Sequence, residues 1–556
     1  MGYNTRHLFP RIAHITPRSQ TEQVRGVIAA GHPQTAAAGA QILGRGGNAV
    51  DAAVGAAFAS FIAEAVLVNI GGGGMAQVFN PAEGRSTVYD FFSTMPGLNG
   101  KPPDKPDFRR ILVDFGPTQQ PFFIGRASAA VPGVVAGLCQ MAADLGRLPL
   151  EQTLRPAIEL ARQGVEMTPA LAYVARILTP IFTDTPGLAA IFAPNGRMVQ
   201  TGERLRLPQL ADTLERLAHH GPDLFYTGDI ARQIVADQQA HGGLITETDL
   251  RQYRVRRLEP VAVPYRGRTV LLPPPASLGG VLIAFMLRLL EPLEPARFTH
   301  NRTGHIRLLA EAMRVANQAR AEQAADILPG PAQDEAVRRF LSDAVVSRYR
   351  QILTRRLADT PLPPDLPAPG GPSSTTHIST ADADGMVVSV TTSAGECAGF
   401  VVGDTGITLN NMLGEIDLHP QGFHRLPPGQ RLSTMMSPVI VLRGGQAELA
   451  VGSGGSNRLR TAITQFLSNV LDFGMDLQTA VDAPRVHFEE DVLQLEGGID
   501  AAVAGSLEQY GYRVNCWPDR NMFFGGTHAV ARQNHRWTAA GDARRGGTVE
   551  VVVNGE

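Results

Sequence analysis

The pattern of apolar and polar positions predicts a long buried helix near the start of the chain. Residues 49–68 are almost all apolar and rich in alanine, with Asn48 directly before them and Asp51 at the third position of the run. An asparagine side chain accepts the free N–H groups of a first helical turn, and an acidic side chain there is stabilising. Because Asp51, Ser60 and Glu64 interrupt the run, it does not read as a membrane span.

Four consecutive glycines at positions 71–74 follow this helix and precede an apolar run at 75–79 that predicts a strand. A glycine-rich turn that binds phosphate normally follows a strand and precedes a helix, which is the reverse of the order here. We therefore expect these glycines to allow backbone segments to approach one another closely.

The pattern changes near residue 374, from mainly helical to mainly strand-like. Before it, helical spacing dominates at 132–257, 281–290 and 303–325. After it, short alternating runs predict the strands of one continuing sheet, at 377–380, 387–392, 406–409, 439–442 and 448–451. A turn is predicted at 383–385, between the first two strands, and a helix at 460–471 covers one face of the sheet. Strands and helices in both parts indicate layers around a shared sheet core.

Composition narrows the class of protein. With 556 residues the chain is too long for one ordinary core, and predicts three or four domains or one large composite. A hydrophobic content of 44% and a charged content of 18% are typical of a soluble globular protein, and a net charge of −2 gives no electrostatic argument for nucleic acid. We expect neither a nucleic-acid partner nor a membrane partner.

The cysteines and histidines give no sign of a metal or a cofactor. Three scattered cysteines form no CxxC pair and no disulfide framework, and the fourteen histidines form no HExxH motif. His300 and His305 are five positions apart, a spacing that does not suit two ligands on one helix face. The first twenty residues lack the apolar core of a signal peptide, so the expected location is the cytoplasm.

The junction between Ser374 and Thr375 is the strongest chemical signal. A Pro/Gly-rich stretch at 361–374 reads as exposed and cleavable, and it meets a strand that begins with a hydroxyl residue. A threonine hydroxyl needs a base before it can attack a carbonyl, and a free α-amino group, with a pKa of roughly 7.7–8.0, is a suitable base. Cleavage before Thr375 would place both groups on one residue. The competing interpretation is an ordinary interdomain linker followed by an edge strand.

Nine segments in sequence order make the chain resemble the γ-glutamyltranspeptidase family of N-terminal-nucleophile hydrolases, and the resemblance covers nearly the whole chain. They are 46–57 (GGNAVDAAVGAA), 70–79 (IGGGGMAQVF), 130–138 (AVPGVVAGL), 221–231 (GPDLFYTGDIA), 245–253 (ITETDLRQY), 273–280 (PPPASLGG), 375–379 (TTHIS), 405–411 (TGITLNN) and 452–458 (GSGGSNR).

The resemblance implies an α+β fold, a four-layer αββα sandwich of the N-terminal-nucleophile hydrolase type. It implies one proenzyme that is cut between Ser374 and Thr375 into segments 1–374 and 375–556, which remain together as one intertwined unit. Thr375 is then the nucleophile, and Ser393 takes the place of a second family threonine that hydrogen-bonds the nucleophile.

The resemblance also implies an oxyanion site. Gly454 and Gly455 correspond to a glycine pair whose backbone N–H groups stabilise the negative oxygen of acyl transfer, although the local sequence leaves this register open by one residue. Ser433 and Thr434 match a serine pair near the scissile carbonyl, with an extra methionine after them that blurs the alignment.

The substrate-binding positions depart from the family. Phe92 stands where an arginine grips the α-carboxylate of a glutamyl group, and phenylalanine makes no such bond. Gly395, Met412 and Glu415 stand where an asparagine, a glutamine and an aspartate hold the α-amino group, so one acid remains. Either the pocket accepts a different, more apolar acyl group, which we favour, or another arginine, Arg126 or Arg458, replaces the lost contact.

We therefore predict a self-processing amidohydrolase or acyltransferase, without metal or organic cofactor, that cleaves a small-molecule amide through an acyl-enzyme. One rival is genuine γ-glutamyl transfer or glutathione hydrolysis, and another is an inactive family member with a binding role. The pattern leaves the acyl group, the choice between water and an amine acceptor, and the oligomeric state open, and does not exclude a higher oligomer.

Overall fold

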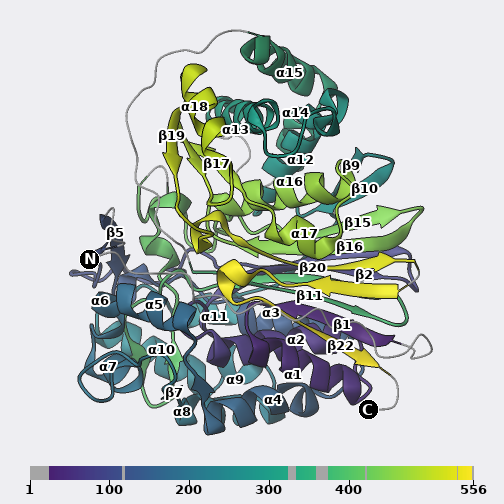
Figure 1. Ribbon diagram of the computed structural model, residues 1–556. Coiled ribbons are helices and arrows are strands. Elements are labelled where there is room, and N and C mark those ends of the chain that lie inside the picture. The colour runs from purple at the N-terminus through teal and green to yellow at the C-terminus, as the bar shows by residue number, and fades with distance from the viewer. Residues whose placement is uncertain are drawn as a thin grey trace.

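The structure is a computed structural model that describes residues 24–114, 119–323, 333–358, 374–419, 422–534 and 536–553. Two antiparallel sheets lie face to face in the middle, with a layer of helices on the outer side of each, as Figure 1 shows. This is the predicted αββα sandwich, and the chain forms one large composite. The proline-rich stretch falls outside the described residues except for Ser374.

The first sheet has seven strands and contains the start of the predicted small segment at its centre. In spatial order the strands are β22 (Thr548–Val553), β1 (Val24–Ala30), β11 (Thr376–Asp382), β12 (Val387–Ser393), β2 (Gly73–Asn80), β3 (Arg85–Phe91) and β8 (Arg256–Leu258). β11 and β12 form the hairpin predicted around 383–385, with Gly385 in the left-handed region. Strands from both sides of residue 374 thus lie next to one another.

The second sheet has six strands and lies against β11 and β12. Its strands in order are β21 (Arg536–Ala540), β20 (Gly526–Gln533), β16 (Gln446–Gly454), β15 (Val439–Arg443), β10 (Arg268–Leu272) and β9 (Val261–Tyr265). The prediction that 439–442 and 448–451 continue the sheet of β11 and β12 is therefore wrong. The run at 406–409 belongs to neither, because β14 (Ile407–Thr408) pairs only with β13 (Val401–Val402).

One helical layer covers the seven-stranded sheet and contributes most of the largest hydrophobic core. Its helices are α1 (Pro33–Gly44), α2 (Ala49–Ala63), α3 (Val134–Leu145), α4 (Leu150–Gln163), α5 (Pro169–Ile177), α6 (Thr179–Phe182), α7 (Pro186–Phe192), α8 (Pro208–His220), α9 (Asp223–Tyr226), α10 (Asp229–Ala240) and α11 (Glu247–Gln252). Asn48 caps α2 as predicted, in a capping box with Asp51, and every residue of this helix is buried.

The other helical layer covers the six-stranded sheet (Figure 1). Its helices are α12 (Leu278–Leu290), α13 (Thr303–Gln323), α14 (Gln333–Phe340), α15 (Asp343–Ala358), α16 (Arg458–Leu471), α17 (Leu477–Asp482) and α18 (Ala501–Gln509). Four small sheets complete the chain: β4 (Arg109–Asp114) with β5 (Gln119–Ile124), β6 (Val165–Glu166) with β7 (Arg204–Leu205), β13 with β14, and β17 (Val486–Glu489) with β18 (Val492–Leu495) and β19 (Arg513–Cys516).

The glycines at 71–74 lie where backbone segments meet, as predicted. A Cβ at Gly72 would overlap the Ser393 carbonyl oxygen, and one at Gly73 would lie 2.8 Å from the Ser93 backbone nitrogen. Larger residues would therefore separate β2 from β12 and β3.

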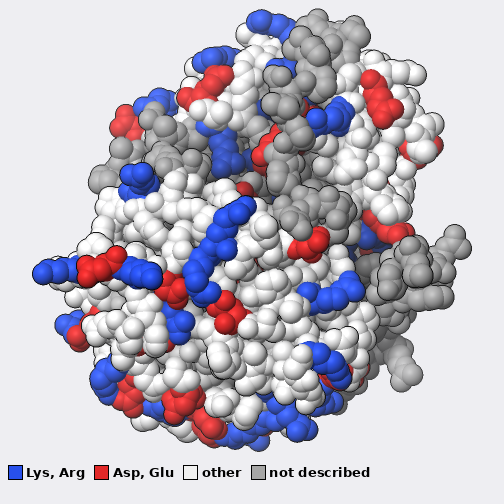
Figure 2. Space-filling model, turned by 90° about the vertical axis from the view of Figure 1, so that its left-hand side faces the viewer, with Lys and Arg blue, Asp and Glu red and all other residues white. Residues whose placement is uncertain are grey.

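The molecular surface carries both signs of charge. On the face in Figure 2, basic and acidic side chains are interspersed over the described residues, in keeping with the small net charge. In the described part of the chain, no helix combines the length and apolar character that crossing a bilayer requires.

The close contact between the two sheets makes a stability prediction. Gly452 of β16 faces the ring of His377 in β11, and a Cβ there would overlap the ring atoms. Gly452→Ala should lower the free energy of unfolding by about 1–3 kcal/mol, because a packed core resists added volume. Gly505→Ala in α18 is the matched control, since nothing lies within 4 Å of that Cβ, and it should stabilise by about 0.5–1 kcal/mol. Urea unfolding of both variants measures the difference, and equal effects would contradict the packing argument.

Candidate active site

Thr375 directly precedes β11 and is almost completely buried, with 4% of its surface exposed. The chain is uncut in this structure, so Thr375 is joined to Ser374. The Nη1 group of Arg545 donates to the Thr375 carbonyl oxygen at 3.3 Å. The backbone on both sides of the predicted cleavage site is thus held in a defined place.

Ser393, at the end of β12, contacts the carbonyl that self-cleavage would attack. Its Oγ donates to the Ser374 carbonyl oxygen at 2.6 Å and accepts from the Gly395 backbone N–H at 3.1 Å. The expected partner was the Thr375 nucleophile, and in the uncut chain the hydrogen bond goes instead to the residue before it. A donor on this oxygen polarises the carbonyl and stabilises the negative charge that develops during attack.

The predicted oxyanion pair, Gly454 and Gly455, lies beside Thr375 at the end of β16 in the second sheet. Gly454 ends β16, and a Cβ there would overlap the Thr375 carbonyl oxygen, so only glycine fits at this position. Gly455 has a φ of 123°, in the region that favours glycine. α16 begins three residues later, at Arg458, so the pair lies between the end of a strand and the N-terminus of a helix.

A buried acid occupies the opposite side of β11 from the glycine pair. Glu64, at the end of α2, accepts hydrogen bonds from Thr376 Oγ1 at 2.6 Å and from Thr35 Oγ1 at 2.8 Å. Burial raises the pKa of Glu64 to about 7, opposed by these two hydrogen bonds and by the charge of Arg545. Burial lowers the pKa of Arg545 to about 10. Thr376 is therefore held by a carboxylate from a distant part of the chain.

Two further acids form a pair beside Ser374. The Glu396 and Glu415 carboxyl groups lie close enough to affect each other's ionisation, and Glu396 lies beside the backbone of Ser374. Burial raises the pKa of both carboxyl groups, and the charge of Glu396 raises that of Glu415 further. Neighbouring carboxyl groups disfavour each other's ionisation, as burial does.

The backbone around this acid pair is tightly packed. Gly395 has a φ of 60°, and a Cβ there would lie 2.8 Å from Glu415 Oε1. Asn411 Oδ1 accepts from the Glu396 backbone N–H at 2.8 Å. Gly395 and Glu415, predicted at substrate-binding positions, are therefore close to each other and to Ser374.

Phe92 and Met412 belong to an apolar cluster. Both are buried, with 1% and 2% exposed, and they share this cluster with Met75, Val88, Met95, Ala130, Leu413, Leu432 and Met436. The backbone N–H of Phe92 donates to Asp90 Oδ1, and its carbonyl accepts from Tyr253 and Arg431. Phe92 and Met412, which the resemblance led us to expect at substrate-binding positions, therefore lie among apolar side chains.

The register of the strands places Phe92 at the same end of the sheet as Thr375. Thr376 lies opposite Thr392, the β12 residue next to Ser393, and Gly74 lies between Thr392 and Phe91. Neighbouring strands are about 4.8 Å apart, so β3 lies three such spacings from β11.

The two arginines considered as replacements differ in their surroundings. Arg126 forms an ion pair with Asp237 at 3.2 Å, and its guanidinium lies 4.2 Å from the centre of the Phe400 ring. Arg458 is buried and its charge acts on Glu396.

Thr434 lies in the bend that joins the apolar cluster to the second sheet, and Ser433 precedes it, half-buried. The Thr434 backbone N–H donates to the Ala276 carbonyl at 2.9 Å, and its Oγ1 accepts from the Met436 N–H at 3.2 Å. The side chain of Thr434 thus stabilises this bend.

Sequence reasoning missed Glu64, Glu396 and Arg545 as site residues. Glu64 carries the clearest signal, because it is an acid in a run that is otherwise almost entirely apolar. Its partner Thr376 lies 312 positions away, and Arg545 lies 170 positions from Thr375. Such contacts follow from the topology of the sheet and not from local pattern.

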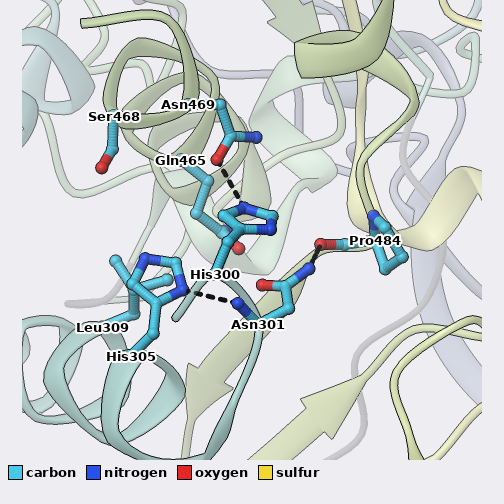
Figure 3. A pocket seen from close by; sticks show the side chains of 8 residues that line it. All are labelled: His300, Asn301, His305, Leu309, Gln465, Ser468, Asn469 and Pro484. Carbon is cyan, nitrogen blue, oxygen red and sulfur yellow. Dashed lines mark hydrogen bonds between the residues drawn. The ribbon is translucent and has the colours of Figure 1, made fainter. Parts of the chain in front are cut away.

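A polar pocket in the other helical layer contains the two histidines considered as metal ligands, as Figure 3 shows. His305 Nδ1 accepts from the Asn301 backbone N–H, so the proton of the neutral ring is on Nε2, which has no hydrogen-bond partner. A protonated nitrogen offers no lone pair to a metal. Among the described residues, no group of three or more His, Cys, Asp or Glu side chains could hold a metal ion.

Comparison with known proteins places the chain in a family. A family model described as gamma-glutamyltranspeptidase matches residues 35–552. The acylase ACY 1 proenzyme of Pseudomonas sp. (strain SE83) is 36% identical over 98% of this chain and 97% of its own length. The glutathione hydrolase proenzyme of Escherichia coli (strain K12) is 30% identical over 88% of this chain and 86% of its own.

A solved structure agrees with these relatives. The crystal structure of cephalosporin acylase from Bacillus halodurans superimposes with a TM-score of 0.81 at 27% identity, and the match covers 97% of this chain and 98% of that one. The resemblance found in the sequence and the expected fold class are confirmed. The chain belongs to the γ-glutamyltranspeptidase family, whose acylase and glutathione hydrolase members are N-terminal-nucleophile enzymes.

Proposed function

We propose that the protein cuts itself between Ser374 and Thr375 and then uses Thr375 to hydrolyse or transfer the acyl group of an amide. The observation that carries this proposal is the hydrogen bond from Ser393 Oγ to the Ser374 carbonyl oxygen, at a buried junction. The proenzyme names of the relatives support a precursor that matures by cleavage. Segments 1–374 and 375–556 would then be permanent partners.

Self-cleavage proceeds by an N-to-O acyl shift. The Thr375 Oγ attacks the Ser374 carbonyl carbon, the peptide C–N bond breaks, and the proton of the hydroxyl passes to the nitrogen. Water then hydrolyses the resulting ester, which leaves a Ser374 carboxylate, the Thr375 hydroxyl and a free Thr375 amine. Ser393 supports the first step because its hydroxyl stabilises the developing oxyanion.

Catalysis then uses the new amine as the base. It takes the proton from Thr375 Oγ as that oxygen attacks the substrate carbonyl, and gives the proton to the departing amine. Gly454 and Gly455 supply backbone N–H groups for the negative oxygen, a contribution of roughly 3–4 kcal/mol for each donor. Water or a second amine releases the acyl group from the acyl-enzyme.

We further propose that the acyl group differs from γ-glutamyl. Phe92 and Met412 belong to a buried apolar cluster, and a substrate carboxylate placed there unpaired would cost several kcal/mol. The similarity to acylases over almost the whole chain supports the same reading. An N-acylated cephalosporin nucleus is therefore a rational first substrate to assay.

Genuine γ-glutamyl transfer remains the second candidate function, and one observation favours it. The pair of Glu396 and Glu415 beside Ser374 is a site where a substrate ammonium group would find a negative charge. The glutathione hydrolase of Escherichia coli, at 30% identity, agrees with this candidate. The substrate comparison below separates the two.

The first prediction concerns maturation. Thr375→Ala should remain a single chain, and Ser393→Ala should cut itself roughly 100-fold more slowly, because one oxyanion donor is lost. Ser389→Ala is the matched control, since its hydroxyl on the same strand donates to the Val451 carbonyl at 3.0 Å, away from the junction. Denaturing gels over time, with mass spectrometry of the new N-terminus, measure the rates. Normal cleavage of Thr375→Ala would refute the mechanism, whereas an original protein that stays a single intact chain and behaves identically to Thr375→Ala would favour an inert binding role.

The second prediction concerns specificity. The matured protein should hydrolyse an N-acyl cephalosporin or another amide with an apolar acyl chain at least about tenfold faster, in kcat/KM, than a γ-glutamyl anilide. Each tenfold step corresponds to about 1.4 kcal/mol of transition-state stabilisation. Spectrophotometric assays of both substrates on one preparation provide the comparison. Turnover of the anilide with a kcat on the order of 10 per second would instead establish γ-glutamyl specificity.

A further inference from the structure

We infer that Glu64 is a positioning residue that holds the nucleophile in place after the chain is cut, by binding the hydroxyl of Thr376. The inference rests on Thr375 being the nucleophile, as proposed above. Glu64 contacts no reacting atom in this structure, so its role is indirect.

The sheet supports the beginning of β11 on one side only. Thr376 pairs with Thr392 of β12, whereas β1 on the other side pairs with β11 only from Ile378 onwards, opposite Ala30. The first two residues of β11 therefore lack a neighbouring strand on the β1 side. Strand ends that lack neighbours open most readily, because few interactions must break.

Glu64 occupies the space on that unsupported side. A Cβ at Gly31, just after the end of β1, would lie 2.5 Å from Glu64 Oε2 and 2.8 Å from Thr376 Oγ1. The carboxylate and the hydroxyl thus fill the place where the side chain of another residue would stand. Thr376 and Thr35 each donate to one of the two Glu64 carboxyl oxygens, and moving either hydroxyl away would leave a buried polar atom without a partner.

The position of Glu64 is itself well determined. Its backbone ends α2, where the Glu64 N–H donates to the Ser60 carbonyl and the Glu64 carbonyl accepts from Leu67 and Val68. Thr35 of α1 donates to its second carboxylate oxygen. The hydrogen bond to Thr376 therefore connects β11 to two helices of the large segment.

Cleavage increases the importance of this contact. In the uncut chain, Thr375 is also tethered through Ser374, whose carbonyl accepts a hydrogen bond from Ser393 Oγ. Once the Ser374–Thr375 bond is broken, that contact no longer acts on Thr375. The Arg545 contact, the packing of Gly454 and the Glu64–Thr376 hydrogen bond remain to fix it.

The inference predicts a pattern of kinetic changes that a general loss of stability would not produce. Glu64→Gln keeps the size of the side chain but leaves one oxygen for two hydroxyl donors. It should lower the kcat of the matured protein about 10-fold or more, with KM within about twofold, while the rate of self-cleavage changes less than about threefold. Thr376→Val should likewise lower kcat while KM and the rate of self-cleavage change little. The kcat of the double variant should be no lower than that of the slower single variant.

Thr380→Val is the matched control, because the Thr380 hydroxyl also joins β11 to α2, through a 2.7 Å hydrogen bond to the Ala49 carbonyl, but contacts neither Glu64 nor Thr376. Its kcat should stay within about twofold of the original protein. The inference is overturned if Glu64→Gln retains full kcat, if it slows self-cleavage as much as turnover, or if Thr380→Val lowers kcat equally. If Thr375→Ala matures and turns over normally, it is the proposed nucleophile that fails and not only the role of Glu64.

Discussion

The pairing of β11 with β12, in which Thr376 lies opposite Thr392, is the constraint on which the rest of the site depends. Because side chains alternate along a strand, a shift of one residue would turn every side chain of β11 to the other face. Thr376 would then leave Glu64, and His377 would leave its buried hydroxyl partners on β12, Thr391 and Ser389. The buried polar contacts on both faces therefore specify one register, and that register presents Thr375 to Gly454.

Several buried ionisable groups surround Thr375, and burying them costs free energy. Burial raises the pKa values of Glu64, Glu396 and Glu415 and lowers that of Arg545, so the folded protein holds each of these groups in an unfavourable environment. Removing ions from water costs several kcal/mol for each, and paired hydrogen bonds recover only part of it. Clusters of this kind are typical of functional sites, where the perturbed groups serve chemistry or the placement of a reacting residue.

Local sequence signals predicted the parts of the fold that local forces determine. The cap at Asn48, the turn at 383–385 and the close packing at 71–74 were all predicted, because each depends on a few neighbouring residues. The division into two sheets was not predicted, because the alternating sequence pattern of an antiparallel strand is the same in either sheet. The same limit applies to the site: motifs identified Thr375 and Ser393, whereas Glu64 lies near them only through the packing of α2 under the sheet. The partner of Ser393 in the uncut chain likewise required three-dimensional coordinates.

The strand order of the seven-stranded sheet determines how the protein can fold before cleavage and after it. Strands from residues before 374 (β1, β2, β3 and β8) and after it (β22, β11 and β12) interleave, and the second sheet is likewise shared between β9 and β10 on one hand and β15, β16, β20 and β21 on the other. A single continuous polypeptide can find this arrangement because its own connections bring the strands together. Two separate pieces would each carry an incomplete sheet with exposed edges, which invite misassembly. Once a matured molecule is denatured, no covalent connection remains to bring its two segments together again. Its lifetime as a folded protein therefore depends on how slowly it unfolds.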